Sequence, residues 1–340
     1  MLRYLIRRLL WALVLFLAVT LVTYVIFFII PANPAARVCG KSCDAAAIQR
    51  AEHFLGTDRP IYIQYLKFLN RLLPVGLREK AGESGEYTGF GFKTPSLGSS
   101  FSTRRDVNTV VLNAAPVTAS LVFGGAVVWM LIALPLGILS ALRPRSLLDR
   151  TGMVFVLIGI SAHPVWIGLI LAYTFGYKLG WTPITGYCDM INPATACGGP
   201  VQWAYHMILP WITFAILFAA LYVRMVRASV METLTEDYVR TARAKGAPES
   251  QVIRSHVLRN ALLPVVTMLG MDIGLALGGA IFTETVFGLP GLGQVALESI
   301  QQFDLPITQG IVVFGTVMIL FFNLVVDLLY AFIDPRIRLS

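Results

Sequence analysis

Six long runs of apolar residues dominate the pattern of this chain. A helix of about 20 apolar residues crosses the hydrocarbon core of a bilayer. The runs are continuous rather than alternating, which indicates helices and not the strands of a membrane barrel. The pattern therefore predicts an all-α polytopic membrane protein with six transmembrane helices. The runs extend over Leu9–Ile30, Val117–Ala141, Gly152–Tyr177, Met207–Val223, Ala261–Ile281 and Gly310–Ile333.

The overall composition excludes a soluble enzyme. Of the 340 residues, 56% are hydrophobic and 14% are charged, and the mean hydropathy is +0.71. A soluble domain carries about 25% charged residues. The formal net charge of +8 would suggest a nucleic-acid partner in a soluble protein. In a membrane protein it follows from the excess of Lys and Arg in cytoplasmic segments, so we expect membrane lipid and no nucleic acid as a partner.

The distribution of Lys and Arg predicts the orientation of the chain. Of the 27 basic residues, 15 lie before the first run, after the last run, and in the segments that follow runs two and four. The positive-inside rule places these segments, and both termini, in the cytoplasm. The segment Pro31–Val110 is too long for its charges to count, because the rule holds for loops of up to about 60 residues. The run Leu9–Ile30 exceeds the ~7–15-residue core of a signal peptide, so we expect a retained helix.

This topology predicts three regions. Residues 1–30 form the cytoplasmic N-terminus and the first helix, residues 31–110 form an extracytoplasmic subdomain, and residues 111–340 form a core of five helices. Within the subdomain, Ala45–Leu55 and Ile61–Leu73 read as short amphipathic helices that lie on the membrane surface or cap the outer helix ends. The Gly- and Ser-rich part that begins at Arg78 and ends at Ser100 reads as irregular.

All four cysteines fall on the predicted outer side. Cys39 and Cys43 flank one short turn, and Cys188 and Cys197 flank a second loop. Because disulfides persist in oxidising compartments, we expect two local pairs. Four free thiols, or a metal site built from all four, are the alternatives. No histidine lies between the members of either pair and no Cys-x-x-Cys occurs, so no metal site is predicted.

The polar loop Met231–Pro264 is the most informative segment. Thr233 with Glu236 three residues later fits a capping box, which predicts the start of a helix. Gly246 suits the position just after the end of that helix, and Pro248 suits the first turn of a second one. The loop therefore predicts a helix–turn–helix elbow whose second helix, residues 249–262, leads into the fifth apolar run.

The first helix of the elbow has two different faces. Val239, Ala242 and Gly246 form a strip of small residues at helical spacing, and Arg240 and Arg243 lie one turn apart on another face. The small residues permit a close approach to a partner, whose acidic groups the arginines can pair with. Alternatively, the basic residues hold the loop against anionic lipid. The spacing alone leaves both interpretations open.

The elbow resembles the EAA loop of ABC-importer permeases. The residues that carry the resemblance are Tyr238–Gly246 (YVRTARAKG) and Leu258–Pro264 (LRNALLP). More narrowly, they resemble the first permease subunit of the dipeptide, oligopeptide and related nickel importers, where Arg-Thr-Ala replaces the Glu-Ala-Ala of other importers. Shorter stretches also resemble that family: Leu55–Pro60, Leu97–Phe101, Pro135–Gly137, Glu284–Phe287 with Pro290–Gly293, and Asp334–Arg336.

The resemblance implies the function of a transporter subunit that moves peptides across a bacterial cytoplasmic membrane. It implies a related second permease subunit, two cytoplasmic ATPase subunits that bind ATP and Mg, and an extracytoplasmic substrate-binding protein. In this family the elbow is a coupling helix that sits in a cleft of the ATPase. The coupling residues that follow from the matching motif are Tyr238, Arg240, Thr241, Ala242, Arg243, Ala244, Lys245 and Gly246.

The chain itself is not expected to be an enzyme. It contains no Gly-x-x-x-x-Gly-Lys-Ser/Thr motif, so it cannot bind ATP through a P-loop. It also lacks a paired-histidine metal motif and a Gly-x-Ser-x-Gly elbow. We therefore predict no catalytic residue and no cofactor bound by this chain.

Three ionisable residues within the apolar runs are candidates for the translocation path. Ionisable groups inside a membrane are costly and often functional, and the candidates are Asp272, His163 and Asp327. Each has a structural alternative. In the alternative for His163, its side chain satisfies backbone groups freed by Pro164. In the alternative for Asp327, its carboxylate reaches water at the inner end of its helix. Asp272 is the strongest candidate, because it lies in the middle of its run.

Acidic residues also surround a Gly- and Pro-containing interruption near the C-terminal end of the chain. Glu284, Glu298 and Asp304 cluster around Pro290–Gly293. They form either an acidic outer mouth that docks a binding protein or an ordinary solvated rim.

Other classes of transport protein fit the sequence less well. An ATP-independent channel or secondary transporter would need charged pore rings or inverted repeats, and neither is visible. An importer of the same family with nickel or another small ligand as cargo is the closer alternative. Metal transport would favour a path lined by Met and His, and His163 with Met153 is too small a set to argue for it.

Overall fold

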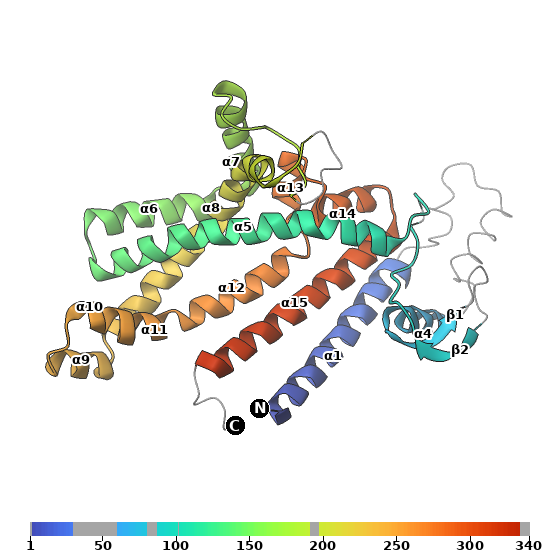
Figure 1. The fold of residues 1–340 in the computed structure, drawn as a ribbon, viewed down its shortest axis with the longest axis horizontal. Helices are drawn as coiled ribbons and strands as arrows, with labels where there is room; N and C mark the ends of the chain where they lie inside the picture. The colour runs from blue at the N-terminus through green and yellow to red at the C-terminus, as the bar shows by residue number, and fades with distance from the viewer. Residues whose placement is uncertain (1, 30–59, 80–86, 101, 191–196, 334–340) are drawn as a thin grey trace. The chain divides into compact units, whose positions relative to one another are not determined.

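The computed structural model describes residues 2–29, 60–79, 87–100, 102–190 and 197–333. This part of the chain is mostly helical, which confirms the predicted all-α class (Figure 1). It divides into two compact units. The first comprises Met1–Ala115 and Val295–Val317, and the second comprises Pro116–Gln294 and Met318–Ser340. Cys39, Cys43 and the expected helix Ala45–Leu55 lie outside the described residues.

The elements follow one another along the chain in a simple order. The N-terminal ones are α1 (Leu2–Tyr24), the π-helical turn η1 (Val25–Ile29), α4 (Ile61–Leu72), β1 (Val75–Glu79) and β2 (Tyr87–Phe92). The central ones are α5 (Val107–Leu142), α6 (Leu147–Ser161), α7 (Pro164–Leu171), η2 (Ala172–Lys178) and α8 (Pro200–Leu234). The remaining ones are α9 (Asp237–Ala244), α10 (Glu249–Gln251), η3 (Val252–Val257), α11 (Leu258–Ala261), α12 (Leu263–Ala276), α13 (Ile281–Phe287), α14 (Leu292–Gln301) and α15 (Leu305–Ile333).

Four helices in the described chain are long and apolar enough to cross a membrane. They are Ile6–Phe27, Val107–Leu142, Pro200–Leu234 and Leu305–Leu329. The total rises to as many as six if each of two bent pairs is one span. These pairs are Leu147–Ser161 with Pro164–Lys178, bent by 106°, and Glu249–Ala261 with Leu263–Ala276, bent by 43°.

The predicted third helix, Gly152–Tyr177, is broken rather than continuous. The break lies at His163, whose backbone is extended with φ −72° and ψ 135°. Pro164 cannot donate a backbone hydrogen bond and disfavours the helical conformation of the residue before it. His163 instead caps α7, because its Nδ1 accepts a hydrogen bond from the backbone N–H of Val165 at 3.3 Å. The prediction of one straight span was therefore wrong.

The ends of the predicted fourth and fifth helices also differ from the structure. Helix α8 has 35 residues and extends beyond Met207–Val223 at both ends. Helix α12 ends at Ala276, before the predicted end at Ile281. The chain turns at Gly279, which has φ +133°, and a Cβ there would lie 2.9 Å from Cα of Gly293. Only glycine allows both this conformation and this backbone contact.

A β-hairpin occupies part of the segment that we expected to be irregular. Strands β1 and β2 pair antiparallel, with Val75 opposite Phe92 and Leu77 opposite Phe90. In the sequence Gly-Phe-Gly-Phe from residue 89, aromatic residues alternate with glycines. Phe90 and Phe92 therefore share one face of the strand. The irregular reading of residues 78–100 was wrong for this part of the segment.

The core of the second unit is built on aromatic rings and small residues. The indole of Trp129 on α5 stacks on Phe218 of α8 with ring centroids 4.6 Å apart. A Cβ at Gly137 would lie 2.7 Å from Cβ of Val226, so α5 and α8 approach closely at that glycine. Helix α6 packs along α8 in the same unit (Figure 1).

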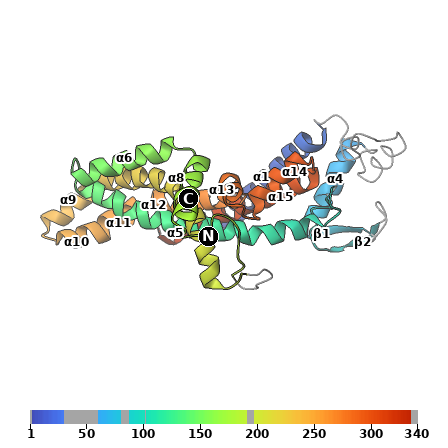
Figure 2. The same cartoon turned by 90° about the horizontal axis from the view of Figure 1, so that it is seen from above.

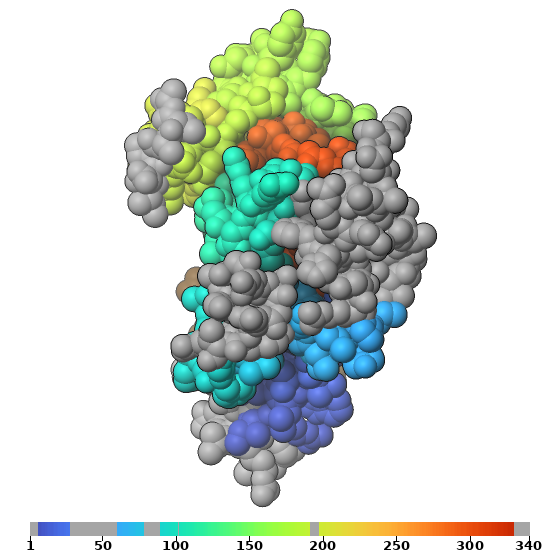
Figure 3. Space-filling view, turned by 90° about the vertical axis from the view of Figure 1, so that its right-hand side faces the viewer, coloured from blue at the N-terminus to red at the C-terminus, as the bar shows by residue number. Residues whose placement is uncertain are grey.

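The first unit places α4 against α1. Helix α4 confirms the helix predicted over Ile61–Leu73, and it lies beside α1 in Figure 3, where α1 is dark blue and α4 is light blue. The ring of Tyr24 on α1 lies 5.7 Å from the ring of Phe68 on α4. A second anchor in this unit is Asp304, which is buried and accepts hydrogen bonds from the hydroxyls of Ser100 and Ser102.

Candidate functional site

The elbow predicted over Met231–Pro264 is present, but its first helix begins later than expected. Helix α8 continues through Thr233 to Leu234, and α9 begins at Asp237. The Thr233 hydroxyl donates to the Ser229 carbonyl at 2.8 Å, and Glu236 caps α9 without a side-chain hydrogen bond. The predicted capping box was therefore wrong, because α8 extends past the apolar run and takes Thr233 into its last turn.

The turn of the elbow has the geometry that the sequence predicts. Helix α9 ends at Ala244, and Gly246 adopts φ +80°. This left-handed conformation disfavours any residue with a Cβ. Pro248 precedes α10 as its N-cap, one position before the predicted first turn. Helices α10, η3 and α11 then form a helical segment that ends at Ala261, close to the predicted Leu262.

The small-residue strip of α9 faces the core of its own chain. Val239 is fully buried together with Val252 and Val257 of η3, and Ala242 packs against the same core. These contacts join the two arms of the elbow into one packed body, and α9 lies beside the second arm in Figure 2. All three residues of the strip lie in the described part of the chain, and of these three Gly246 is the exposed one.

The opposite face of α9 is open to solvent. The exposed members of the predicted coupling set are Tyr238, Arg240, Thr241, Arg243, Ala244, Lys245 and Gly246, whereas Ala242 is half-buried. The Tyr238 hydroxyl accepts a hydrogen bond from Nδ2 of Asn260 at 2.9 Å. Tyr238 therefore contacts the second arm while its ring stays accessible.

Two arginines on this face form ion pairs with acidic side chains of the elbow. Nη2 of Arg243 lies 2.7 Å from Oε1 of Glu249, and Nε of Arg243 lies 3.2 Å from Oε2 of Glu249. This pair bridges the turn between α9 and α10. Nη1 of Arg240 lies at the longer distance of 3.9 Å from Oδ1 of Asp237. Arg240 and Lys245 thus present their charges outward, whereas Arg243 also holds the elbow together.

A buried ion pair connects α8 with the start of α6. Asp149 accepts hydrogen bonds from Nε and Nη2 of Arg227, at 2.7 Å and 3.0 Å. The same carboxylate accepts from the backbone N–H of Arg145 at 2.9 Å and from the Ser140 hydroxyl at the end of α5. None of these residues was predicted from the sequence. The sequence did contain a signal for them. Asp149 is an acidic residue in the loop between the second and third apolar runs, on the same predicted side of the membrane as the arginines that follow the fourth run.

The three candidates for the translocation path lie on different elements. Asp272 on α12 is half-buried and accepts a hydrogen bond from the Tyr222 hydroxyl at 2.6 Å. His163 is exposed at the break between α6 and α7, and its ring lies 5.0 Å from that of Phe282 in an edge-on contact. Asp327 is partly buried on α15.

Both interpretations of the acidic cluster, an outer mouth and a solvated rim, are wrong for Glu284, because this side chain is fully buried. Its carboxylate accepts hydrogen bonds from the Thr118 hydroxyl at 2.8 Å and from the backbone N–H groups of Ala280 and Gln294 at 3.3 Å and 3.0 Å. Burial raises the pKa of Glu284, and these hydrogen bonds oppose the rise. The Thr118 hydroxyl in turn accepts from the N–H of Leu292 at 2.8 Å.

Asp304 is the second buried member of the expected mouth. Besides the serine hydroxyls, it accepts a hydrogen bond from the backbone N–H of Ser102 at 3.2 Å. Glu284 and Asp304 therefore serve to fix loops within their own units, and neither offers a charge to an external partner.

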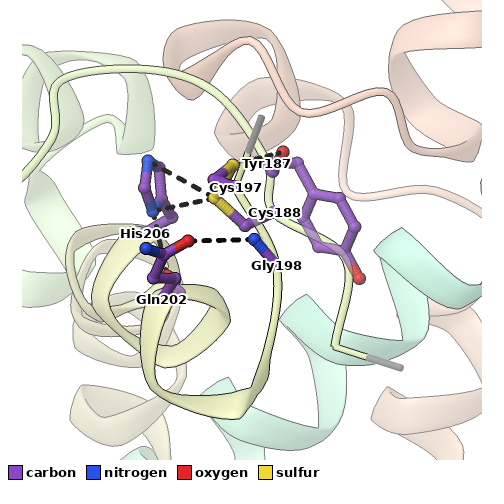
Figure 4. Close-up of a disulfide and its surroundings, with 6 residues drawn as sticks. All are labelled: Tyr187, Cys188, Cys197, Gly198, Gln202 and His206. Atoms are coloured by element: carbon purple, nitrogen blue, oxygen red, sulfur yellow. Dashed lines mark hydrogen bonds between the residues drawn. A yellow bond between two sulfur atoms is a disulfide. The ribbon is translucent and has the colours of Figure 1, made fainter. Parts of the chain in front are cut away.

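A disulfide joins Cys188 and Cys197 beside His206 (Figure 4). Nδ1 of His206 lies 3.3 Å from Sγ of Cys188, and Oε1 of Gln202 accepts from the N–H of Gly198 at 2.9 Å. Ligand atoms of the two cysteines and His206 lie within 4.8 Å of one another. With the sulfurs bonded to each other, neither is the thiolate that a metal ion requires.

Comparison with known proteins gives consistent matches over the whole chain. The family described as "Binding-protein-dependent transport system inner membrane component" matches residues 133–339, and the family of the corresponding N-terminal component matches residues 1–122. The di/tripeptide transport system permease protein DppB of Pseudomonas aeruginosa is 35% identical, over 99% of both chains. The dipeptide permease DppB of Escherichia coli K12 is 34% identical and the glutathione permease GsiC of Pectobacterium atrosepticum is 35% identical, each over 99% of both chains.

Among solved structures, the MetNI methionine ABC transporter in an inward-facing conformation is similar in fold. The TM-score is 0.52 at 18% sequence identity, over 67% of this chain and 97% of that one. At this identity, the likeness shows a shared fold and carries no information on the cargo.

Proposed function

The chain belongs to the family of binding-protein-dependent transport system inner membrane components, and from this membership we propose that it is a permease subunit of an ATP-driven importer of di- or oligopeptides. The observation that carries the proposal is the match with peptide permeases at 34–35% identity over 99% of both chains. The glutathione permease supports the same class of cargo, because glutathione is a tripeptide. Nickel or another small ligand is the alternative cargo.

The proposed assembly supplies what this chain lacks. The sequence contains no P-loop motif, so the energy comes from two cytoplasmic ATPase subunits that bind ATP and Mg. A second permease subunit completes the path, and an extracytoplasmic binding protein delivers the peptide. The excess of Lys and Arg supports a cytoplasmic location for both termini and for the elbow in a bacterial-type inner membrane.

The elbow is the proposed contact with the ATPase. Its exposed face carries Arg240 and Lys245, which are suited to pair with carboxylates on the partner. Its buried face is packed around Val239 and braced by the pair of Arg243 with Glu249. A packed elbow moves as a unit, so a displacement imposed on it by ATP-driven closure reaches the helices to which it is joined.

Helix α8 is the proposed lever. Its 35 residues correspond to a length of about 50 Å at a rise of 1.5 Å per residue. The pair of Arg227 with Asp149 links α8 to α6 close to the elbow end. Movement of the elbow would therefore displace α6 together with α8, which couples the ATPase to two membrane helices.

Asp272, His163 and Asp327 remain the proposed path residues. The case is strongest for Asp272. Its half-buried carboxylate accepts a hydrogen bond from Tyr222, and it lies in a membrane helix, where an acidic group is costly. A carboxylate at that point would attract the ammonium group of a zwitterionic peptide.

The proposal is tested by purifying the chain from its native membrane under mild conditions. We expect ATPase subunits and a second polytopic permease to co-purify with it. Repeated recovery of the intact chain without any ATPase would contradict the proposal and favour an ATP-independent channel. Cargo is then tested by adding the binding protein with dipeptides, tripeptides or Ni²⁺ to the reconstituted complex. Stimulation of ATP hydrolysis by peptides supports the peptide assignment, and stimulation by Ni²⁺ alone overturns it.

A further inference from the structure

Helix α4 packs against α1 within the length of a membrane span, not beyond its end. The candidate span is Ile6–Phe27. The Tyr65 hydroxyl of α4 donates to the carbonyl of Leu17 at 3.2 Å, and the Tyr24 hydroxyl of α1 donates to Oε1 of Gln64 at 2.9 Å. At 1.5 Å per residue, the contacts lie between about 5 Å and about 15 Å from the end of the span at Phe27. An extracytoplasmic helix resting on top of the membrane would not reach this depth.

The direction of α4 fits a helix that lies in the plane of the membrane. In Figure 1, α4 is seen along its axis while α1 is seen from the side, and in Figure 2 α4 is drawn along its length. The two helices therefore cross steeply. If α1 spans the bilayer, α4 lies roughly parallel to the bilayer surface.

The polar and apolar side chains of α4 are distributed as such a position requires. The polar groups of Gln64 and Tyr65 face α1, where they are hydrogen-bonded. The side exposed to the surroundings carries Tyr62, which is 67% exposed, and Leu66, which is 60% exposed. In-plane membrane helices bury such an apolar face about 5–10 Å deep at the boundary of headgroups and acyl chains. Lys67 follows Leu66 by 100° around the helix and lies on another face.

We propose that α4 is an in-plane membrane helix, embedded in the bilayer half that the C-terminal part of α1 reaches, with Tyr62 and Leu66 in contact with lipid acyl chains. The occupant of this apolar face is lipid, because α1 also exposes apolar side chains, Leu21 and Val22, within the stretch against which α4 packs. The inference rests on the membrane span of α1 and is independent of the cargo.

The embedded helix has a consequence for the hairpin beside it. Nδ2 of Asn70 donates to the Leu77 carbonyl at 3.0 Å, and Oδ1 of Asn70 accepts from the Leu77 N–H at 2.9 Å. These two bonds fasten β1 to the end of α4. The hairpin is therefore held close to the membrane surface by a helix that lipid anchors.

The proposal is tested with nitroxide labels in the assembled complex in lipid nanodiscs. Tyr62→Cys and Leu66→Cys are labelled in turn, in a chain with Cys39→Ser and Cys43→Ser, so that the disulfide of Cys188 and Cys197 is retained. Collisions with O₂, which concentrates in lipid, are compared with collisions with a water-soluble Ni²⁺ chelate. References are Lys67→Cys on another face of α4, Leu13→Cys on the exposed side of α1, and Arg105→Cys in an exposed loop.

Labels at Tyr62 and Leu66 are expected to resemble the label at Leu13, with an O₂-to-chelate ratio several-fold higher than at Lys67. A ratio as low as at Arg105 would mean that the face meets water. Protection from both reagents would mean that a protein covers it. Either of these results overturns the proposal, and because two positions one turn apart are labelled, a local failure at one leaves the other as the test.

Discussion

The guanidinium of Arg243 and the carboxylate of Glu249 meet across the turn of the elbow, with Nη2 and Oε1 2.7 Å apart. Arg243 belongs to the segment that resembles the coupling loop of ABC importers, and Glu249 opens the second arm. The side chains are 41% and 56% exposed, so the pair lies where a partner protein can also reach it. Arg243 can therefore act as a brace within the elbow, as a contact to the ATPase, or as both.

Arg243→Ala is expected to lower peptide-stimulated ATP hydrolysis with little effect on the stability of the chain. Both side chains are largely exposed, so water and salt screen the pair and its loss should change the free energy of unfolding little. The measurements are the melting temperature of the purified complex and its peptide-stimulated ATPase rate. A large loss of stability would show that the pair supports the fold more than its exposure suggests.

The reciprocal exchange R243E/E249R separates the two roles of this pair. The exchange keeps an ion pair across the turn but reverses the charge on α9. Recovery of coupling in the double variant indicates a brace. Failure to recover, with each single variant folded, indicates a direct contact between Arg243 and the ATPase.

Gly246→Pro is expected to abolish coupling while basal ATP hydrolysis persists. Proline fixes φ near −65°, whereas Gly246 requires +80°, so the turn between α9 and α10 cannot form. Gly246→Ala is milder, because a left-handed residue with a Cβ costs about 1–2 kcal/mol. The measurement is peptide uptake per ATP hydrolysed in proteoliposomes.

The matched control for the turn is Gly288→Ala. Gly288 also adopts a left-handed conformation, with φ +59°, at the end of α13. An alanine at Gly288 therefore has the same kind of backbone strain as an alanine at Gly246, but at a position outside the elbow. If both alanine variants lose coupling equally, the effect at Gly246 reflects general destabilisation and not transmission through the elbow.

Much of the fold could be predicted from hydropathy, because an apolar run of sufficient length has few alternatives in a membrane. The break at His163 was harder to predict, since the apolar run continues through Pro164 without a change in composition. The capping box at Thr233 failed for a related reason. A local motif indicated a helix start, but α8 continues past it, with Val226, Val230 and Thr233 buried in its last turns.

The elbow could be predicted from local signals, above all Gly246 and Pro248, which act on neighbouring residues. The environment of Glu284 could not, because its partner Thr118 is 166 residues away in sequence. An acidic residue near a Gly- and Pro-rich loop reads as solvated until the distant element that buries it is known. The same holds for Asp304 and Ser100, which are 204 residues apart.

Asp149→Asn is expected to destabilise the second unit by about 2–4 kcal/mol, somewhat below the typical cost of breaking a buried ion pair, because Arg227 is 25% exposed. The variant leaves the guanidinium of Arg227 without its charged partner. The double variant D149L/R227M removes both charges and should be less destabilised than Asp149→Asn. Thermal unfolding of the three proteins in nanodiscs checks this order, and a double variant less stable than the single one would contradict it.

Glu284 predicts a pH dependence of stability with a definite sign. Burial raises the pKa of this carboxyl in the folded chain, so the protonated form is favoured by folding. Its stabilising contribution is present at low pH and is lost as the pH rises from about 4.5 through the raised pKa. The wild type should therefore lose stability relative to Glu284→Gln on going from acidic to neutral pH, as melting curves at several pH values would show. A difference that stays constant with pH would mean that the hydrogen bonds of Glu284 offset its burial.

Removal of the disulfide between Cys188 and Cys197 is expected to lower the free energy of unfolding by about 2–3 kcal/mol. The bond closes a loop with a sequence separation of 9, and a loop of this length restricts the unfolded chain by roughly that amount. C188S/C197S should melt at a lower temperature than the wild type, and a reductant should lower the melting temperature of the wild type but not of the double variant. The sequence also predicts a bond between Cys39 and Cys43, which a reductant would cut as well, so C39S/C43S is the matched control. If C39S/C43S no longer responds to the reductant while C188S/C197S still does, the stabilising bond lies at the other pair of cysteines.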